Sequence, residues 1–468
     1  MSKVEEVIRA VLERVRPNAL ERELVGKVVS DVLARIKAVA ERLGVKVEAR
    51  VEGSIAKDTW ISGDRDIDVF IRLPREVGRE GLESIGLQIA REAAGDKWIE
   101  CYAEHPYIEA EVNGFKVDLV PCFAVRSSEE AESAVDRTPF HTDYINLHLS
   151  EDLRDEVRLL KQFMKGIEVY GAEVKVQGFS GYLCELLVMR YNSFIDVLKA
   201  AAYDWKPYSM VIDIEGHYSS NFEPLILFKA PLVVVDPVDR RRNVAAALSL
   251  QKMCEFMAAS RAFLENPDLK FFYPPKLTPL SFDEVLNEFN KRGTDFLFIL
   301  TGCPKAHPDV LWGQFYKSAD GIKRLLEIYG FRIIDYAVWS DELHYLVFLF
   351  ELECADLPPL KKHLGPPVYA RDHSIRFVEK YLKDASPIAG PKIEGDRWIV
   401  YVNRKYRRAK DLISEKLLEA RLGKLVYSEL SRGFKVMLND GVYEFYNASR
   451  GFANFLSKYL LGKPRWLL

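Results

Sequence analysis

Two aspartates, Asp66 and Asp68, alternate with apolar residues in the stretch Asp-Ile-Asp-Val-Phe. Alternate side chains of a strand share a face, so the two carboxylates are expected on one face, roughly 7 Å apart. That separation suits oxygen-ligated cations about 3.5–4 Å apart, as in two-metal phosphoryl transfer. The alternative is a pair of solvent-facing residues on a half-exposed strand. A third acid, Asp118, lies within an apolar strand, where a carboxylate is costly unless it is paired or binds metal.

A tight turn at Gly53-Ser54 precedes these acids. We expect a strand over 47–51, a short helix over 55–60, and a strand over 64–73. A helix N-terminus approached by Gly-Ser presents backbone N–H groups to an anion, and the Ser54 hydroxyl adds a donor. Because this turn stands directly before the paired acids, the stretch 53–70 indicates a phosphate site beside a metal site.

The other elements are expected to position this stretch. Asn113-Gly114 is a strong hairpin signal between strands over 99–111 and 115–123, and Pro106 indicates a bulge or an edge in the first of them. Apolar spacing predicts helices over 4–15, 21–43, 81–94, 151–165 and 182–202. Farther on, the pattern strand, helix, strand, strand over 294–300, 315–329, 331–339 and 343–353 suggests a small α+β sandwich like those of many RNA-binding modules.

Length and composition set the class. The chain has 468 residues, 48% of them hydrophobic and 29% charged, which is typical of a soluble protein with two to four domains. The N-terminus is charged and amphipathic rather than a signal peptide, and no apolar run of about 18 residues could span a membrane. The six cysteines are scattered without a Cys-x-x-Cys motif, so we expect reduced thiols in a cytoplasmic protein, not zinc or disulfides.

Charge is unevenly distributed along the chain. Residues 361–468 contain 22 Lys and Arg against 11 Asp and Glu, although the whole chain has a net charge of −3. The most basic stretch is 401–408, where tyrosines alternate with Arg404, Lys405, Arg407 and Arg408. A basic arm beside an acidic catalytic part suits binding to an RNA backbone. The alternative is a merely solvated surface.

The spacing of Gly-Ser, Asp-x-Asp and the later Asp resembles the palm of polymerase-beta-type nucleotidyltransferases over about the first 125 residues. Four further motifs resemble the archaeal (class I) CCA-adding enzymes, a family of tRNA nucleotidyltransferases. They are Asp-Arg-Thr-Pro-Phe-His at 136–141, Tyr-Gly-Ala-Glu at 170–173, Gly-Phe-Ser-Gly-Tyr at 178–182, and Val-Asp-Pro-Val-Asp at 235–239 with Arg-Asn-Val-Ala at 242–245. The resemblance extends over essentially the whole chain. Neck motifs of the bacterial type are not found.

The resemblance implies an α+β, multidomain fold. It has a palm of mixed or antiparallel sheet and helices as head (1–135), a helical, nucleotide-binding neck (136–277), a ferredoxin-like RNA-binding body (278–360) and a basic tail (361–468). The implied reaction adds C, C and A to the 3′ end of tRNA from CTP and ATP. It uses two Mg²⁺ ions and no nucleic-acid template. A homodimer is compatible with the family.

The resemblance also assigns roles to individual residues. The catalytic metal carboxylates are Asp66, Asp68 and Asp118. The nucleotide contacts are Ser54 and Lys57 for the triphosphate, Thr138, His141, Lys161 and Tyr170 from the neck, and Arg242 for the base. The contacts to primer or tRNA are Glu104 and His105 near the 3′ end, Lys317 in the body, and the four cations of the basic stretch. Lys57 and Lys317 stand where the family pattern has arginine.

Two other functions share parts of this pattern. Another template-independent polymerase, such as a poly(A) polymerase or an oligoadenylate synthetase, would have the palm but should lack the motifs at 136–141 and 235–245. A non-catalytic RNA-binding protein with a dead palm would have no need of the third aspartate, Asp118.

Overall fold

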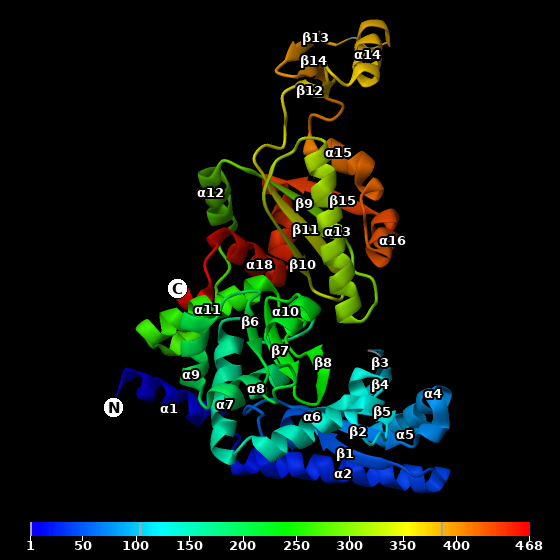
Figure 1. Ribbon diagram of the computed structural model, residues 1–468, viewed down its shortest axis with the longest axis vertical. Helices are drawn as coiled ribbons and strands as arrows, with labels where there is room; N and C mark the ends of the chain where they lie inside the picture. The colour runs from blue at the N-terminus through cyan, green and yellow to red at the C-terminus, as the bar shows by residue number, and fades with distance from the viewer. Residues whose placement is uncertain (1, 103–104, 385–386) are drawn as a thin grey trace. The chain divides into compact units, whose positions relative to one another are not determined.

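The structure is a computed structural model that describes residues 2–102, 105–384 and 387–468. The chain divides into two compact units, Met1–Lys276 with Pro464–Leu468, and Leu277–Lys463. Figure 1 traces both units from the blue N-terminus to the red C-terminus. The palm and the neck motifs lie in the first unit, so the candidate site is described within that unit alone.

A mixed sheet with the strand order β1-β2-β5-β4-β3 forms the centre of the palm. Its strands are β1 (Glu48–Glu52), β2 (Asp66–Leu73), β3 (Trp98–Tyr102), β4 (Pro106–Val112) and β5 (Phe115–Phe123). The neighbours β2 and β5 run parallel, and the other pairs are antiparallel. Helices α2 (Ala19–Leu43) and α5 (Leu87–Ala94) bury their apolar side chains against one face of this sheet. Figure 1 shows α2 running alongside β1 and β2. The other face is left for polar side chains.

The rest of the first unit is mainly helical. Its further helices are α1 (Lys3–Val15), α3 (Gly53–Ala56), α4 (Gly78–Gly81), α6 (Ala134–His148), α7 (Glu151–Gly166), α8 (Gly181–Tyr191), α9 (Phe194–Lys199), α10 (Phe222–Phe228) and α11 (Leu250–Glu265). A small sheet in the order β6-β7-β8 comprises Met210–Ile212, Leu232–Asp236 and Asp239–Asn243. The buried ring of Phe163 on α7 packs against aromatic rings from α9 and α11, which joins these helices in one core.

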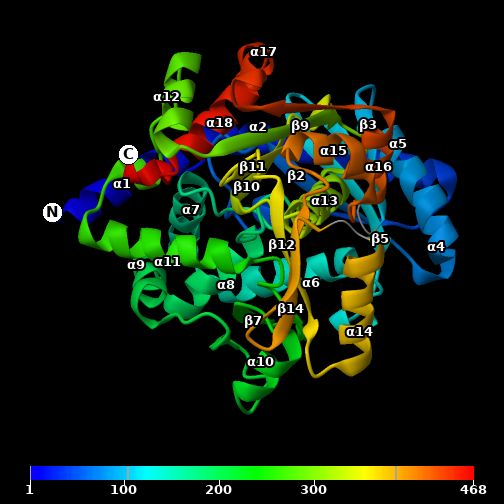
Figure 2. The same cartoon turned by 90° about the horizontal axis from the view of Figure 1, so that it is seen from above.

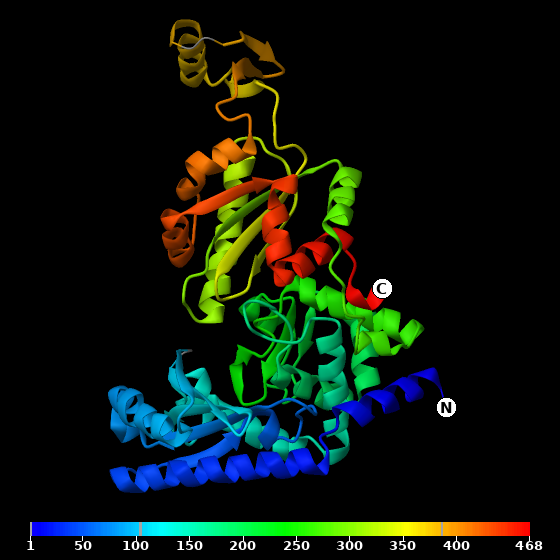
Figure 3. The same ribbon diagram turned by 180° about the vertical axis from the view of Figure 1, so that it is seen from behind.

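The second unit contains an antiparallel sheet in the order β10-β11-β9-β15. Its strands are β9 (Asp295–Gly302), β10 (Ile333–Ser340), β11 (Tyr345–Leu352) and β15 (Phe434–Leu438), and its helices are α12 (Phe282–Arg292), α13 (Pro308–Ile328), α15 (Ala409–Lys416), α16 (Lys424–Arg432), α17 (Tyr443–Ala448) and α18 (Arg450–Leu461). With α13 between β9 and β10, and α15 and α16 before β15, this is a ferredoxin-like arrangement (Figure 3). The expected strand, helix, strand, strand pattern is confirmed.

Residues 361–468 do not form a separate unit. Strand β15 pairs with β9 and thus completes the sheet that 295–352 begins, although it lies beyond the expected boundary at residue 360. A smaller sheet in the order β12-β14-β13 comprises Leu360–Pro367, Arg397–Asn403 and Ala389–Glu394. Helix α14 (Arg371–Glu379) lies beside β12 and β14 (Figure 2). The four-domain division stays a proposal.

Three expected elements differ from those observed. The helix expected over 182–202 is interrupted, because Asn192 adopts a left-handed conformation (φ 66°) and Ser193 caps a new helix. The strand expected over 99–111 is divided into β3 and β4, with Pro106 at the start of β4. The short helix after the first strand covers Gly53–Ala56 rather than 55–60. No helix within the described residues has the length and apolar character needed to cross a bilayer.

Candidate active site

Carboxylates form a row across one face of the palm sheet. In the strand register Asp68 on β2 faces Asp118 on β5, and Glu109 on β4 faces Asp118 from the other side. Directly opposed residues of neighbouring strands present their side chains on the same face. Asp66, two residues before Asp68, shares this face and is exposed. The three predicted acids are therefore neighbours.

Burial and neighbouring carboxylates make Asp118 and Asp68 hard to ionise. Burial, together with the charges of Asp68, Glu109 and Asp66, raises the pKa of Asp118 to about 7, although Lys116 opposes this. Burial also raises the pKa of Asp68. The Lys116 ammonium lies 2.8 Å from a Glu109 oxygen and 3.9 Å from Asp118 Oδ1, which has no hydrogen-bond partner among the described residues. The four carboxylates of this cluster thus outnumber the positive charge of Lys116.

These residues fit a divalent cation that substrate helps to hold. Within the described part of the chain, no three His, Cys, Asp or Glu side chains already surround a point where a metal ion could sit. Mg²⁺ is usually held by one or two carboxylates together with substrate phosphates, not by a closed protein cage. An open row of acids with an unpaired oxygen matches that requirement.

The Gly53-Ser54 turn lies directly against Asp68. Gly53 has φ +66°, and a Cβ built on it would lie 2.1 Å from Asp68 Oδ2. Both the conformation and the space therefore require glycine. Ser54 is half-buried within α3. The predicted phosphate turn and the predicted metal acids are thus in contact.

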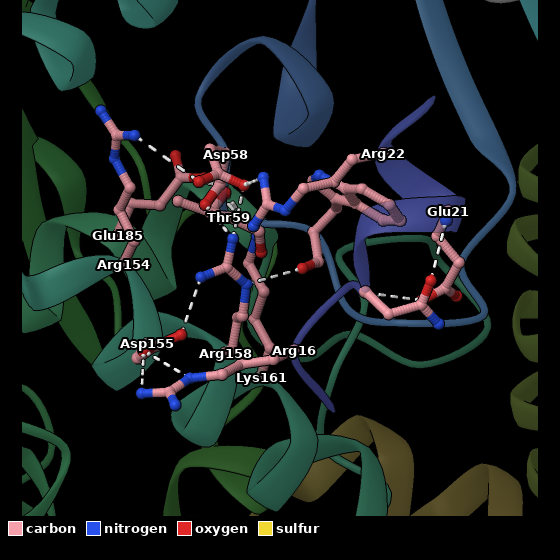
Figure 4. A network of polar contacts seen from close by, with 12 residues as sticks. Arg16, Glu21, Arg22, Asp58, Thr59, Arg154, Asp155, Arg158, Lys161 and Glu185 are labelled. Atoms are coloured by element: carbon pink, nitrogen blue, oxygen red, sulfur yellow. Dashed lines mark hydrogen bonds and ion pairs between the residues drawn. The ribbon is translucent and has the colours of Figure 1, made fainter. Parts of the chain in front are cut away.

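Two lysines predicted to contact the nucleotide, Lys57 and Lys161, share one buried glutamate. Lys57 Nζ lies 2.5 Å from Glu185 Oε2, and Lys161 Nζ lies 3.5 Å from Glu185 Oε1. The Thr59 hydroxyl donates to Glu185 Oε1 (2.6 Å), and Lys161 donates to Thr59 Oγ1 (3.0 Å). Figure 4 shows Thr59, Lys161 and Glu185 converging. Burial opposes ionisation of Glu185, but Lys57 and Lys161 outweigh it and keep its pKa below the ordinary value.

A second buried carboxylate, Asp236 on β7, gathers the other nucleotide residues. His141 Nε2 and Arg242 Nη1 each lie 2.9 Å from Asp236 Oδ2, and the Tyr182 hydroxyl donates to Asp236 Oδ1 (3.1 Å). The rings of His141 and Tyr182 stack at 4.3 Å. Burial lowers the pKa of His141, so its ring is neutral at pH 7. The Nε2–H group then donates a hydrogen bond to the Asp236 carboxylate. Lys57 Nζ lies 5.5 Å from the Tyr182 ring centre, which makes the two clusters neighbours.

A pocket of about 580 Å³ adjoins this second cluster. Arg241, Arg242 and Lys229 line it together with Ser180 and Phe228, and no carboxylate does. Asp236 accepts a hydrogen bond from Nη1 of Arg242. A guanidinium has five N–H donors, so Arg242 can also donate to a ligand in the pocket.

The other predicted nucleotide residues lie nearby. A Cβ on Gly181, at the start of α8, would lie 3.1 Å from the Tyr170 hydroxyl and 3.6 Å from Lys161 Nζ, so these groups are adjacent. Burial raises the pKa of Tyr170 well above its ordinary value. Thr138 is half-buried on α6, the helix that also carries His141.

The predicted RNA contacts are more dispersed. His105 is buried at the start of β4 and neither ring nitrogen has a hydrogen-bond partner among the described residues, whereas Glu104 lies outside them. Lys317 is exposed on α13 in the second unit. The four cations of the basic stretch follow β14, and Arg404 and Arg407 already donate to backbone carbonyls at Pro358 (3.0 Å) and Leu357 (3.3 Å).

Sequence reasoning missed Thr59, Tyr182, Glu185 and Asp236 as parts of the site. Glu185 did give a signal, because a carboxylate within a strongly apolar helix must find a partner when it is buried. Asp236 lies in a motif that was noted only for its resemblance. Neither signal could identify the partners, which come from distant parts of the chain.

Comparisons with known proteins identify the family of this chain. Three family models match: a nucleotidyltransferase domain over residues 34–141, the second domain of tRNA nucleotidyltransferase over 155–273, and the C-terminal domain of CCA-adding enzyme over 292–439. Among solved structures, a Cid1 poly(U) polymerase matches with 16% identity and a TM-score of 0.47, covering 57% of this chain and 96% of that chain. That similarity is too low to add to the assignment.

Similar proteins of named function cover almost the full chain. The CCA-adding enzyme of Methanosarcina barkeri is 44% identical over 94% of this chain and 95% of its own length. The CCA-adding enzymes of Pyrobaculum neutrophilum and Halobacterium salinarum are 42% and 39% identical over 89% and 94% of this chain, and 94% and 95% of their own lengths. The chain belongs to the family of CCA-adding enzymes, which are tRNA nucleotidyltransferases.

Proposed function

We propose that this protein adds C, C and A to the 3′ end of tRNA from CTP and ATP and releases pyrophosphate. Family membership supports the reaction class. The observation that carries the proposal is the row of carboxylates against the Gly53 turn, in which Asp118 Oδ1 has no hydrogen-bond partner among the described residues. Buried carboxylates destabilise a protein unless they bind a partner. A palm without catalytic activity would therefore not explain these acids beside a turn that requires glycine.

Asp66, Asp68 and Asp118 would hold two Mg²⁺ ions. Such ions lower the pKa of the attacking 3′-hydroxyl and stabilise charge on the leaving pyrophosphate. The chain's own residues do the rest. The backbone N–H groups and hydroxyl of the Ser54 turn bind phosphate oxygens, and the net positive charge of the Lys57–Glu185–Lys161 cluster attracts the triphosphate.

His141, Tyr170, Thr138 and Arg242 would form the nucleoside side of the pocket. Arginine only donates hydrogen bonds, so Arg242 suits the ring nitrogen acceptor that both C and A present beside an exocyclic amine. U and G present an N–H at the matching position, which would oppose the guanidinium. Asp236 fixes Arg242 through one nitrogen, so selection needs no nucleic-acid template.

The RNA would be held by both units. Near the primer end we assign Glu104 and His105, and in the second unit Lys317, Arg404, Lys405, Arg407 and Arg408. Because Arg404 and Arg407 are bonded to backbone carbonyls, Lys405 and Arg408 are the members best able to meet phosphate. The six cysteines are free, which supports a cytoplasmic site of action.

The deciding experiment offers the protein a tRNA that lacks its 3′ end, with each labelled nucleotide in turn and in combination. We expect incorporation of C alone up to the second position, and of A only after both C residues. Runs of A on many RNAs would identify a poly(A) polymerase-type enzyme instead. Binding of the tRNA without any incorporation would favour a non-catalytic RNA-binding protein.

A further inference from the structure

Three successive backbone carbonyls after the phosphate turn accept hydrogen bonds from helix α7. Arg158 Nη2 donates to the carbonyl of Asp58 (2.5 Å), Lys161 Nζ to that of Thr59 (3.0 Å), and Arg158 Nε to that of Trp60 (2.9 Å). Arg158 and Lys161 lie three residues apart, so they face the same side of α7. Figure 4 shows both side chains reaching the segment at Asp58 and Thr59.

The segment that they hold is conformationally costly. Asp58 has φ +48°, in the left-handed region that residues with a Cβ rarely adopt. Such a conformation persists only when the surroundings impose it. The Asp58 carboxylate is itself bound by Arg158 Nη2 (2.6 Å) and Arg22 Nη1 (2.8 Å), as Figure 4 shows.

Glu185, on helix α8, binds the same segment. Its carboxylate contacts Lys57, Thr59 and Lys161, and the Lys57, Lys161 and Glu185 side chains are at most 7% exposed. Burying three charges is expensive, and an apolar replacement often stabilises a protein more. A gain in stability alone therefore does not explain this cluster. What it does achieve is a fixed position for Lys57 and, four residues before it, for the Gly53 turn.

We propose that Arg158 and Glu185 are positioning residues for the nucleotide triphosphate. They hold residues 57–60 in one conformation, so the Gly53-Ser54 turn and the Lys57 ammonium are in place before the nucleotide arrives. Preorganisation of this kind raises affinity because less conformational freedom is lost on binding. This inference rests on the proposed function. Lys161 belongs to the same cluster, since its ammonium donates to Thr59 and lies 3.5 Å from Glu185 Oε1.

The test uses Arg158→Lys. This substitution keeps the positive charge but removes the planar guanidinium, whose Nε and Nη2 donate to two carbonyls. Arg154→Lys on the same helix is the matched control, since Arg154 forms a 3.6 Å ion pair with the Asp58 carboxylate and, among the described residues, donates to none of the three carbonyls. We expect KM for CTP and for ATP to rise together at least fivefold in Arg158→Lys, with KM for tRNA unchanged. Arg154→Lys should stay within twofold of the parent protein.

Two measurements do not depend on activity. Amide hydrogen exchange should become faster within 53–60 in Arg158→Lys and Glu185→Gln, and elsewhere stay as in the parent protein. Calorimetry with inorganic tripolyphosphate should show a loss of affinity in Arg158→Lys and none in Arg154→Lys. Equal tripolyphosphate affinities in Arg158→Lys and the parent protein would overturn the proposal.

Unchanged exchange at 53–60 together with an unchanged nucleotide KM in Arg158→Lys would also overturn it. If Glu185→Gln fails to fold, hydrogen exchange and nucleotide KM in Arg158→Lys still test the proposal, because that variant keeps the charge and most of the packing. Failure of the parent protein to extend a truncated tRNA would refute the proposed function, whereas the exchange comparison would still report on these positioning residues.

Discussion

Three properties distinguish Asp118 from an ordinary surface carboxylate. It is largely buried, it lacks a hydrogen-bond partner on Oδ1, and burial raises its pKa to about 7. Asp68 lies opposite it in the strand register and touches the Gly53 turn, whereas Asp66 is exposed beside them. The chemistry of the palm face thus depends on single carboxylates whose charge the free protein compensates poorly.

The first residue-scale prediction concerns these acids. Asp68→Ala should abolish nucleotide addition, and Asp66→Ala and Asp118→Ala should do the same, because each removes an oxygen ligand from the metal site. Folding and tRNA binding should be retained, since the acids do not form part of the apolar core. Extension of a truncated tRNA with Mg²⁺ as the only metal checks this. Incorporation close to that of the parent protein would remove the tested residue from the site.

The second concerns pH. The folded-state pKa of Asp118, about 7, exceeds the value near 3.9 expected in the unfolded chain, so the protonated carboxyl favours the folded state. That stabilisation is complete below about pH 4 and is lost as pH rises through about 7. The metal-free protein should therefore lose the contribution of Asp118 progressively between about pH 4 and about pH 7. Mg²⁺ needs the ionised carboxylate, so it should raise Tm more at pH 8 than at pH 6.

Thermal melting in EDTA and in Mg²⁺ at both pH values provides the measurement. Asp118→Asn, which cannot ionise, should show a smaller difference between the two Mg²⁺ shifts. An equal Mg²⁺ shift at pH 6 and pH 8 in the parent protein would mean that Asp118 does not control metal binding.

The third concerns Arg242. If its guanidinium faces the base, a U or G would leave a buried donor opposite a donor, which costs on the order of 1–3 kcal/mol and gives roughly tenfold or greater rejection. Arg242→Ala should therefore lose CTP and ATP incorporation together and narrow their advantage over UTP. Competition between CTP and UTP measures this. Equal losses for all four nucleotides, with the CTP/UTP ratio preserved, would make Arg242 a phosphate ligand.

At the scale of elements, the sequence pattern predicted those elements whose signals lie within a few neighbouring residues. Alternation of apolar and acidic residues identified β2 and β5, and Gly-Ser identified the turn, because these signals lie within a few neighbouring residues. The break after α8 depends on Asn192 adopting a left-handed conformation, which no apolar periodicity reveals. The pairing of β15 with β9 joins segments more than a hundred residues apart and leaves no local signal.

The contacts between side chains of different elements could not be predicted from the sequence either. Glu185 on α8 meets Lys57 from the turn after β1 and Lys161 from α7, and Asp236 on β7 meets residues of α6, α8 and β8. A sequence can show that a buried carboxylate needs a partner, but only the fold shows which one. Lys161 is an example, since it was expected as a nucleotide contact from the neck, and its bond to the Thr59 carbonyl could not be foreseen.

At the scale of the whole molecule, acidic and basic side chains are concentrated in different parts of the chain. The palm face is acidic, whereas residues 361–468 carry twice as many basic as acidic side chains, 22 against 11. That division suits a protein whose first unit holds cations and nucleotide while its second unit binds a polyanion. It also means that RNA affinity and nucleotide affinity should respond to different substitutions.

The last prediction tests that separation in the basic stretch. Lys405, Arg407 and Arg408 are exposed, and Arg408 forms a 3.8 Å ion pair with Asp356. Arg404 and Arg407 also donate to backbone carbonyls. Replacing Lys405 and Arg408 by glutamine should raise KM for tRNA and lower the slope of log K against log salt by roughly 0.7–0.9 per lost phosphate contact. KM for CTP should barely move. Replacing Arg404 and Arg407 should lower Tm as well, because carbonyls at Pro358 and Leu357 lose their donors. An unchanged salt slope in the Lys405 and Arg408 double variant would show that these charges form only a solvated surface.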